Sequence, residues 1–354
     1  MYSHIPNIND GFDMVQRGLI LTLKEKSRNN ELCDADYIEQ CAIRDYKIGR
    51  FETEDILACL AQPFLLNYPV VEICGNYGNI YGDVSGFSEW MKVKLSDYSV
   101  SLFSDLQGND YCDLGILNIL INGTMHNKTE KRSNIPPHNI EDIINCLIGL
   151  IDNPSMDTAE IIGIIKGPDF PTGGVISDFM QIDKIYKNGK GTLSLSAKYK
   201  VESYKNNSTA LVIYEIPYLL YVCDIDKKLS KYLMENLDII DDWNISCADT
   251  YATIKIFFKS KADRECIDEF VKKINKKGLL KNTFEILFNV NVDSQQRIMN
   301  IKEIMDYCVA KLRSTYAKNG VGEDKINDEL KKNLKSFSEK FARNRRTEIK
   351  IDLP

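Results

Sequence analysis

The sequence predicts an α+β fold, because strand-like and helix-like patterns fall in separate stretches of the chain. Residues 191–201 alternate apolar and polar side chains, which is the period of a half-buried strand. Residues 261–276 and 301–318 instead repeat apolar residues at helical spacing. Earlier in the chain, a helical pattern at 36–64 leads into a β-rich run at 66–73. We therefore expect a helical first part, a mixed second part and a helical end.

Asn153-Pro154 is the best candidate for a domain boundary, because Pro154 ends a strong helical pattern. Asn139 is the expected N-cap of that helix, and His138 before it is expected to be a helix-entry residue rather than a catalytic base. Further strands are expected at 210–214, 253–258 and 283–290, and a helix at 228–237. The expected domains are 1–153, 154–300 and 301–354.

The composition is that of a globular protein without a membrane segment: 354 residues, 44% hydrophobic and 27% charged. No run of eighteen apolar residues and no basic-then-apolar leader is present, so we expect a cytoplasmic protein. Ten cysteines lie scattered without a CxxC pair, and there are only three histidines. This distribution predicts reduced thiols and no metal site built by this chain alone.

The net charge of −6 excludes a uniformly basic surface but leaves room for a local basic channel. One such bias lies between Lys331 and Lys350, where eight basic residues face two acidic ones. This segment is either a solvated helix face or a tail that contacts phosphates.

A glycine-rich stretch, Gly75 to Ser96, is the centre of the functional interpretation. Gly75, Gly78 and Gly82 predict a tight, non-repetitive turn, because glycine permits positive φ and close backbone approach. Asp83 stands where the N-cap of a following helix is expected. A turn of this kind is by itself weak evidence for a ligand site.

Read together with five other motifs, this stretch resembles the breakage-reunion (A) subunit of bacterial type IIA topoisomerases, gyrase and topoisomerase IV. The motifs are Asp10 to Arg17 (DGFDMVQR), Leu60 to Phe64 (LAQPF), Gly75 to Asp83 (GNYGNIYGD), Asn134 to Asn139 (NIPPHN), Gly167 to Gly174 (GPDFPTGG) and Glu215 to Tyr218 (EIPY). The resemblance covers nearly the whole chain. It implies a winged-helix-type DNA-binding domain, then a tower-like α+β domain and the start of a helical region.

The resemblance places altered residues where the family performs its chemistry. Trp90 occupies the position of the tyrosine that attacks DNA, and Glu89 occupies that of its neighbouring arginine. Indole has no hydroxyl, and a carboxylate repels the phosphate that an arginine would bind. Asn127 stands where the family inserts an apolar wedge into DNA, and the HPHG slot of the second DNA-contacting helix reads Tyr46 to Gly49.

The first interpretation is therefore a protein that binds duplex DNA, or a topoisomerase subunit, without cleaving DNA. The alternative is a working or split topoisomerase subunit that uses another tyrosine, and Tyr77, Tyr81 and Tyr98 are the candidates. Tyr98 would lie eight residues beyond Trp90, about 12 Å along a helix. A third interpretation is an interaction protein without DNA contact.

We expect no catalytic residue, metal or cofactor in this chain; Mg²⁺ and ATP would enter only through a B-type partner. The expected partners are duplex DNA, a topoisomerase B-type or A-type chain, and a weak homodimer, since the sequence stops about where the family's coiled coil begins. The candidate DNA contacts are Arg17, Lys47, Arg50, Asn76, Lys92, Lys94 and Arg132.

Overall fold

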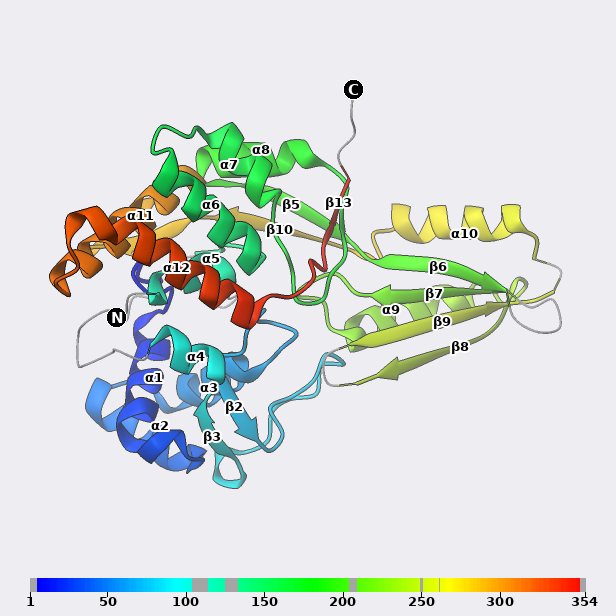
Figure 1. Ribbon diagram of the computed structural model, residues 1–354. Helices are drawn as coiled ribbons and strands as arrows, with labels where there is room; N and C mark the ends of the chain where they lie inside the picture. Colours follow the sequence, from blue (N-terminus) through cyan, green and yellow to red (C-terminus); the bar gives the residue numbers. More distant parts are fainter. Residues whose placement is uncertain are drawn as a thin grey trace.

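Helices form most of the first and last parts of the protein (Figure 1). The computed structural model describes residues 5–103, 114–124, 133–203, 209–248, 251–260 and 262–350, without the side chains of residues 28 and 50–52. The helices are α1 (Met14–Lys26), α2 (Ala35–Tyr46), α3 (Arg50–Ala61), α4 (Asp97–Leu102), α5 (Asn118–Ile121), α6 (Ile140–Asp152), α7 (Thr158–Ile165), α8 (Phe179–Asn188), α9 (Val222–Met234), α10 (Arg264–Lys276), α11 (Ile301–Lys318) and α12 (Glu323–Phe341). Single 3₁₀ turns occur at Arg28–Asn30, Ser88–Trp90 and Gly115–Leu117.

The strands form several small sheets rather than one large one. They are β1 (Cys33–Asp34), β2 (Val71–Cys74), β3 (Lys92–Leu95), β4 (Val175–Ile176), β5 (Lys190–Ser196), β6 (Lys198–Ser203), β7 (Thr209–Glu215), β8 (Ile240–Cys247), β9 (Ala252–Phe258), β10 (Lys281–Leu287), β11 (Asn289–Val292), β12 (Gln295–Ile298) and β13 (Glu348–Ile349). Their orders are β1-β3-β2, β10-β5-β4-β13, β11-β12 and β6-β7-β9-β8, and the mixed α+β fold class is confirmed.

Side-chain caps explain where three long helices begin. Asp13 and Gln16 form a capping box at α1, and Asn300 and Glu303 form another at α11. At α6 the Asn139 side chain accepts hydrogen bonds from two backbone N–H groups of the first turn, as the sequence predicts. These bonds satisfy donors that a helix start leaves without partners.

Among the residues that the structure describes, two hydrophobic clusters hold the fold together. The larger cluster runs from Ile8 to Phe337 and joins α1–α3, α6–α8, β5 and the two C-terminal helices. The second packs α9 and α10 against one face of the sheet β6-β7-β9-β8, which projects to the right in Figure 1. Because the larger cluster includes residues on both sides of Asn153, it does not test the expected division there, which stays a prediction.

The expected strand at 191–201 is split between two sheets. Its first half is β5, which pairs with β10, and its second half is β6, which pairs with β7. Burial alternates along β5 up to Ala197 but not along β6, where Tyr199 is 38% exposed at a sheet edge. Likewise, residues 283–290 are divided between β10 and β11, and the helix expected at 228–237 begins earlier, at Val222.

One local prediction is wrong. Asp83 caps no helix; its carboxylate accepts a hydrogen bond from Asn79, and the chain stays irregular until Ser88. The segment Leu114–Gly123 forms a 3₁₀ turn and the short helix α5. Among the described residues, no helix combines the length and apolarity needed to cross a bilayer.

Candidate nucleic-acid interface

The glycine-rich stretch connects β2 to β3 through an irregular loop held by two asparagines. The Asn76 side chain accepts a hydrogen bond from the N–H of Gly78, and the Asn79 side chain accepts bonds from the N–H groups of Gly82 and Asp83. Gly78 and Gly82 have φ values of 85° and 112°, which residues with a Cβ atom rarely adopt. The tight turn predicted from the sequence is present.

This loop contacts the start of α9. The N–H groups of Val222 and Cys223 donate to the carbonyls of Ile80 and Tyr81 at 3.1 and 2.9 Å. The N-cap of α9, Tyr221, has no capping side chain, so the loop carbonyls satisfy donors of the first helical turn. Ile80 is buried in the second hydrophobic cluster, so the loop packs against the part of the fold formed by α9, α10 and the sheet β6-β7-β9-β8.

Trp90 lies on the 3₁₀ turn at the end of the loop, and its side chain is 79% exposed. Its ring packs edge-to-face against Phe87, with centroids 5.8 Å apart, and Phe87 is itself 67% exposed. Glu89 between them is exposed as well. An exposed apolar pair next to an acidic residue is therefore presented at the position where the resemblance expects a nucleophile and a cation.

The three alternative tyrosines are buried or half-buried. Tyr98 is only 3% exposed, donates a hydrogen bond to Asn118, and burial raises its pKa well above the ordinary value. It is not on the same helix as Trp90, because strand β3 separates the 3₁₀ turn from α4; the expected helical spacing was wrong. Tyr77 and Tyr81 are half-buried, and Tyr81 packs against the second cluster.

Three of the candidate DNA-binding cations form ion pairs within the protein. Arg17 pairs with Asp10, a carboxyl whose pKa is raised to about 6 by burial in spite of the arginine. Lys94 and Glu72 are 3.0 Å apart across strands β3 and β2. Lys92 lies 4.0 Å from Asp34, a loose pair between exposed side chains.

The other candidates are exposed or lie outside the described residues. Lys47 ends α2 with its side chain exposed, and Asn76 is exposed on the loop. Arg50 is the first residue of α3, but its side chain is not among those that the structure describes. Asn127 and Arg132 also lie outside the described residues.

The motif Gly167 to Gly174 holds the C-terminal arm, defined here as residues 342–350. Asp169, which is fully buried, accepts hydrogen bonds from the backbone N–H groups of Arg346 and Thr347, and pairs with the Arg343 guanidinium at 3.1 Å. Beyond the motif, β13 of the arm runs parallel to β4. The motif is thus the receptor for a segment further along the chain, in which Thr347 lies 178 residues beyond Asp169.

Arg345 fastens the same arm by several bonds. It pairs with Asp142 of α6 at 2.7 Å and donates to the carbonyls of Gly167 and Pro168. The side chains of Arg343 and Arg345 are only 15% and 21% exposed. The interpretation of the basic C-terminal segment as a phosphate-contacting tail is therefore wrong for these two arginines, although Lys332 and Lys335 remain exposed on α12.

His138 is a structural residue, as the sequence predicts. Its side chain is completely buried; Nδ1 lies 2.8 Å from the Leu120 carbonyl and Nε2 lies 2.7 Å from the Tyr186 hydroxyl. Burial lowers its pKa to about 4. A neutral imidazole that joins three segments cannot also reach a substrate.

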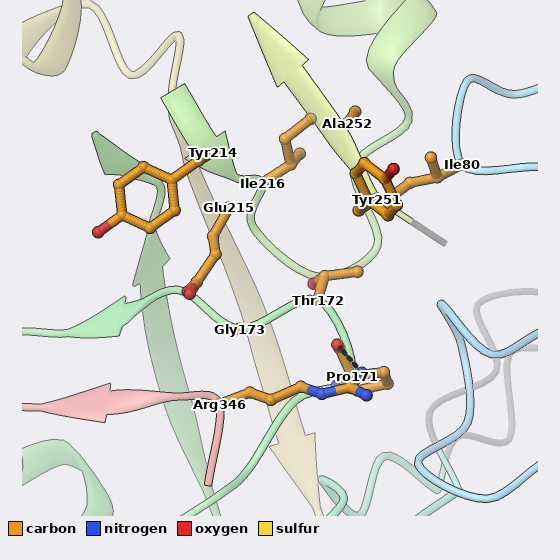
Figure 2. Close-up of a pocket in the computed structure, with 10 residues that line it drawn as sticks. All are labelled: Ile80, Pro171, Thr172, Gly173, Tyr214, Glu215, Ile216, Tyr251, Ala252 and Arg346. Atoms are coloured by element: carbon orange, nitrogen blue, oxygen red, sulfur yellow. Dashed lines mark hydrogen bonds between the residues drawn. The ribbon is translucent and has the colours of Figure 1, made fainter. Parts of the chain in front are cut away.

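A cavity of about 270 Å³ opens where four parts of the fold meet (Figure 2). These are the motif Gly167 to Gly174, the loop from Gly75 to Trp90, the C-terminal arm and the sheet β6-β7-β9-β8. The cavity is lined by Ile80, Pro171, Thr172, Gly173, Tyr214, Glu215, Ile216, Tyr251, Ala252 and Arg346. No local pattern in the sequence indicates this cavity. The only local feature that could have pointed to it is the group of arginines at 343, 345 and 346, but the surroundings of these residues depend on a distant segment.

Within the described part of the chain, no group of three or more His, Cys, Asp or Glu side chains is arranged to hold a metal ion. The cysteines that are described are all free thiols. The expectation that Mg²⁺ and ATP enter through a partner stays a prediction.

The fold and motifs define a type IIA topoisomerase A-type chain, and the comparisons agree. Residues 115–349, well over half of the chain, match the family described as the A subunit of DNA gyrase/topoisomerase IV, so the protein belongs to that family. It is 27% identical to the DNA gyrase A subunit of Buchnera aphidicola over 85% of this chain and 38% of the relative.

Two further relatives give the same result. The identity is 27% to the DNA gyrase A subunit of Kosmotoga olearia, over 88% of this chain and 41% of the relative. It is 26% to that of Thermotoga maritima, over 85% of this chain and 40% of the relative. The chain thus spans about two fifths of the length of these relatives.

Proposed function

We propose that this chain is an A-type topoisomerase subunit that engages duplex DNA, or pairs with a topoisomerase subunit, without cleaving DNA. The part up to Asn153 acts as the winged-helix-type domain of the family, and the sheet with α9 and α10 acts as its tower. In this arrangement the loop from Gly75 to Trp90 lies where the family brings its nucleophile to DNA. The exposed indole of Trp90 carries this proposal.

The chemistry of strand cleavage supports the loss of activity. Cleavage needs an oxygen nucleophile in line with the leaving 3′ oxygen, and a cation near the developing charge. Trp90 supplies no oxygen, and Glu89 supplies the wrong sign of charge. Loss of a catalytic nucleophile costs on the order of 10⁶ in rate in other enzymes, more than contacts elsewhere can restore. Tyr98 is the first tyrosine after Trp90 in the sequence, and its burial prevents it from acting as a substitute nucleophile.

Weak DNA binding follows from the state of the cations. Arg17 and Lys94 form ion pairs within the protein, so Lys47 and Lys92 are the more available contacts among the described candidates. Each phosphate contact contributes to an affinity that depends on salt. We expect non-specific binding, with a dissociation constant of roughly 10⁻⁴ to 10⁻⁶ M at physiological salt.

Trapping of covalent adducts tests the inactive state. The unmodified protein, a bacterial gyrase B subunit, Mg²⁺, ATP and labelled duplex DNA are incubated and then denatured with detergent. We expect no protein–DNA adduct from the unmodified chain, and little from Trp90→Tyr alone, because Glu89 still opposes the phosphate. The double variant Glu89→Arg, Trp90→Tyr is the better rescue.

An adduct from the unmodified chain would refute this proposal. Mapping it to Tyr81 would assign the role of nucleophile to that residue. A separate titration of the chain with labelled duplex DNA at increasing salt tests binding. Absence of binding even at low salt would leave an interaction protein without DNA contact.

A further inference from the structure

The three arginines of the C-terminal arm do not have equal partners. Arg343 pairs with Asp169, and Arg345 pairs with Asp142 and several carbonyls. Arg346 donates one side-chain hydrogen bond, to the Pro171 carbonyl, and its guanidinium forms no ion pair with any carboxylate that the structure describes. The rest of its donor edge therefore remains available at the cavity that Figure 2 shows.

The charge around Arg346 is not fully compensated. Partial burial and the nearby positive charge of Arg343 lower the pKa of Arg346, although a guanidinium stays charged at neutral pH. Asp169 is a buried carboxylate in the arm's receptor, but it is already ion-paired with Arg343 and accepts hydrogen bonds from two backbone N–H groups. An anion in the cavity would supply the missing partner.

A second donor lies at the same cavity. The Thr172 hydroxyl is enclosed and has no hydrogen-bond partner among the described residues. A buried hydroxyl without a hydrogen-bond partner destabilises the fold. In Figure 2 Thr172 lies above the end of the Arg346 side chain and Pro171. Rotation about its Cα–Cβ bond would let the hydroxyl meet a bound group.

Glu215 also lines the cavity, and its negative charge would oppose an anion. Its carboxylate is, however, bonded to the Gly174 N–H at 2.6 Å and lies 3.2 Å from the Lys198 ammonium. The opposing charge is thus paired within the protein. The remaining wall is apolar or aromatic, with Ile216 on one side and the 64%-exposed Tyr251 on the other.

We propose that this cavity binds a phosphate group, held by the Arg346 guanidinium and the Thr172 hydroxyl. A guanidinium offers a planar fork that matches two oxygens of a phosphate, and a phosphate has further oxygens for a hydroxyl. The phosphate is either free, as orthophosphate or a mononucleotide, or part of the backbone of duplex DNA. The second source rests on the proposed function, and the first does not.

The first experiment uses orthophosphate and AMP as probes, with ³¹P line broadening measured on the whole chain. Arg346→Gln is compared with Arg297→Gln, which removes the same charge from exposed strand β12. We expect binding to weaken about ten-fold or more in Arg346→Gln, the loss typical of one charge-assisted hydrogen bond, and to stay unchanged in Arg297→Gln. Equal broadening in all three proteins, at every concentration, would refute a free-phosphate site.

The second experiment measures binding of a fluorescent duplex from about 50 to about 200 mM salt. If the backbone is the source, Arg346→Gln reduces the slope of log affinity against log salt by about one, and Arg297→Gln does not. Weaker phosphate binding with an unchanged DNA slope assigns the site to a free phosphate. If wild type binds DNA but neither probe responds to Arg346→Gln, the site is refuted while the proposed function stands.

Two further variants guard against misfolding. Arg346→Lys keeps the charge but loses the fork, so it should keep the DNA slope and still bind orthophosphate less tightly. Thr172→Val removes the hydroxyl at nearly constant volume. It should weaken phosphate binding but raise stability to urea, because an unbonded polar group is removed. Phosphate binding as tight as wild type in both variants would refute the proposal even if Arg346→Gln failed to fold.

Discussion

Two glycine-containing motifs look alike in the sequence but have opposite surroundings in the fold. The loop from Gly75 to Trp90 is tied at its middle to α9 and exposes Phe87 and Trp90 at its end. The motif from Gly167 to Gly174 directs its polar groups inward, toward the C-terminal arm. A recognisable motif can therefore be an internal receptor as readily as a ligand site. The contrast predicts large effects of substitution at the second motif and small ones at the tip of the first.

The largest effect is expected from Asp169→Asn. Asparagine can still accept the backbone bonds of the arm, but the Arg343 guanidinium loses the partner of its largely buried charge. Removal of one member of a buried ion pair costs about 3–5 kcal/mol. The measurement is the free energy of unfolding in urea, with Asp152→Asn as control, since that carboxylate forms an exposed pair with Lys331. Equal losses of unfolding free energy in Asp169→Asn and Asp152→Asn would contradict the expected difference between the buried motif and an exposed ion pair.

The second-largest effect is a pH dependence of the unfolding free energy that arises from His138. Its Nε2 atom lies 2.7 Å from the hydroxyl of Tyr186 in α8. Its folded pKa of about 4 lies below the ordinary 6.5, so the folded state holds the neutral form. Stability from this group is present above pH 6.5 and is lost as pH falls toward 4. At pH 4 the loss is about 3 kcal/mol relative to pH 7.

A comparison of wild type with His138→Gln isolates this group. The difference in unfolding free energy between the two proteins should shrink as the pH falls, because glutamine does not titrate. Asp10 also titrates in this range, but it is present in both proteins and cancels from the difference. A difference that does not change with pH would show that His138 titrates normally.

A smaller effect is expected at the middle of the loop. In Gly82→Ala the new Cβ would lie 2.7 Å from the Cys223 sulfur, and φ of 112° is unfavourable for alanine. We expect a loss of about 1–3 kcal/mol in urea. Gly86→Ala, in the same loop, meets only Asn76 at an ordinary 3.6 Å and should be neutral or slightly stabilising. If both variants behaved alike, the loop would not be fixed at α9.

The smallest effect is expected from Trp90→Ala. The indole is 79% exposed and its ring packs on Phe87, which is itself exposed, so stability should change by less than about 0.5 kcal/mol. Thermal unfolding measures this directly. A loss of several degrees in the melting temperature would mean that Trp90 belongs to the core, and would remove the contrast with the buried motif.

Local sequence determined some of the helices and the glycine-rich turn. The caps Asn139 and Asn300 act within three residues, and the apolar spacing of 301–318 describes α11 fully. The asparagines of the Gly75 loop likewise bond to nearby backbone. The family resemblance also follows from the sequence, because the motifs are contiguous runs. Such features need only neighbours along the chain, so a pattern is enough to predict them.

Tertiary structure alone decided which of the named side chains are available. Tyr98, Arg17, Arg343 and Arg345 all read as candidate surface groups, and each is buried or paired by residues from other segments. The break at Ala197 depends in the same way on which strands pair with β5 and β6. A carboxylate far away along the chain leaves no mark on the local pattern around an arginine. Whether a charge faces solvent or a partner is therefore fixed only when the chain folds and distant segments meet.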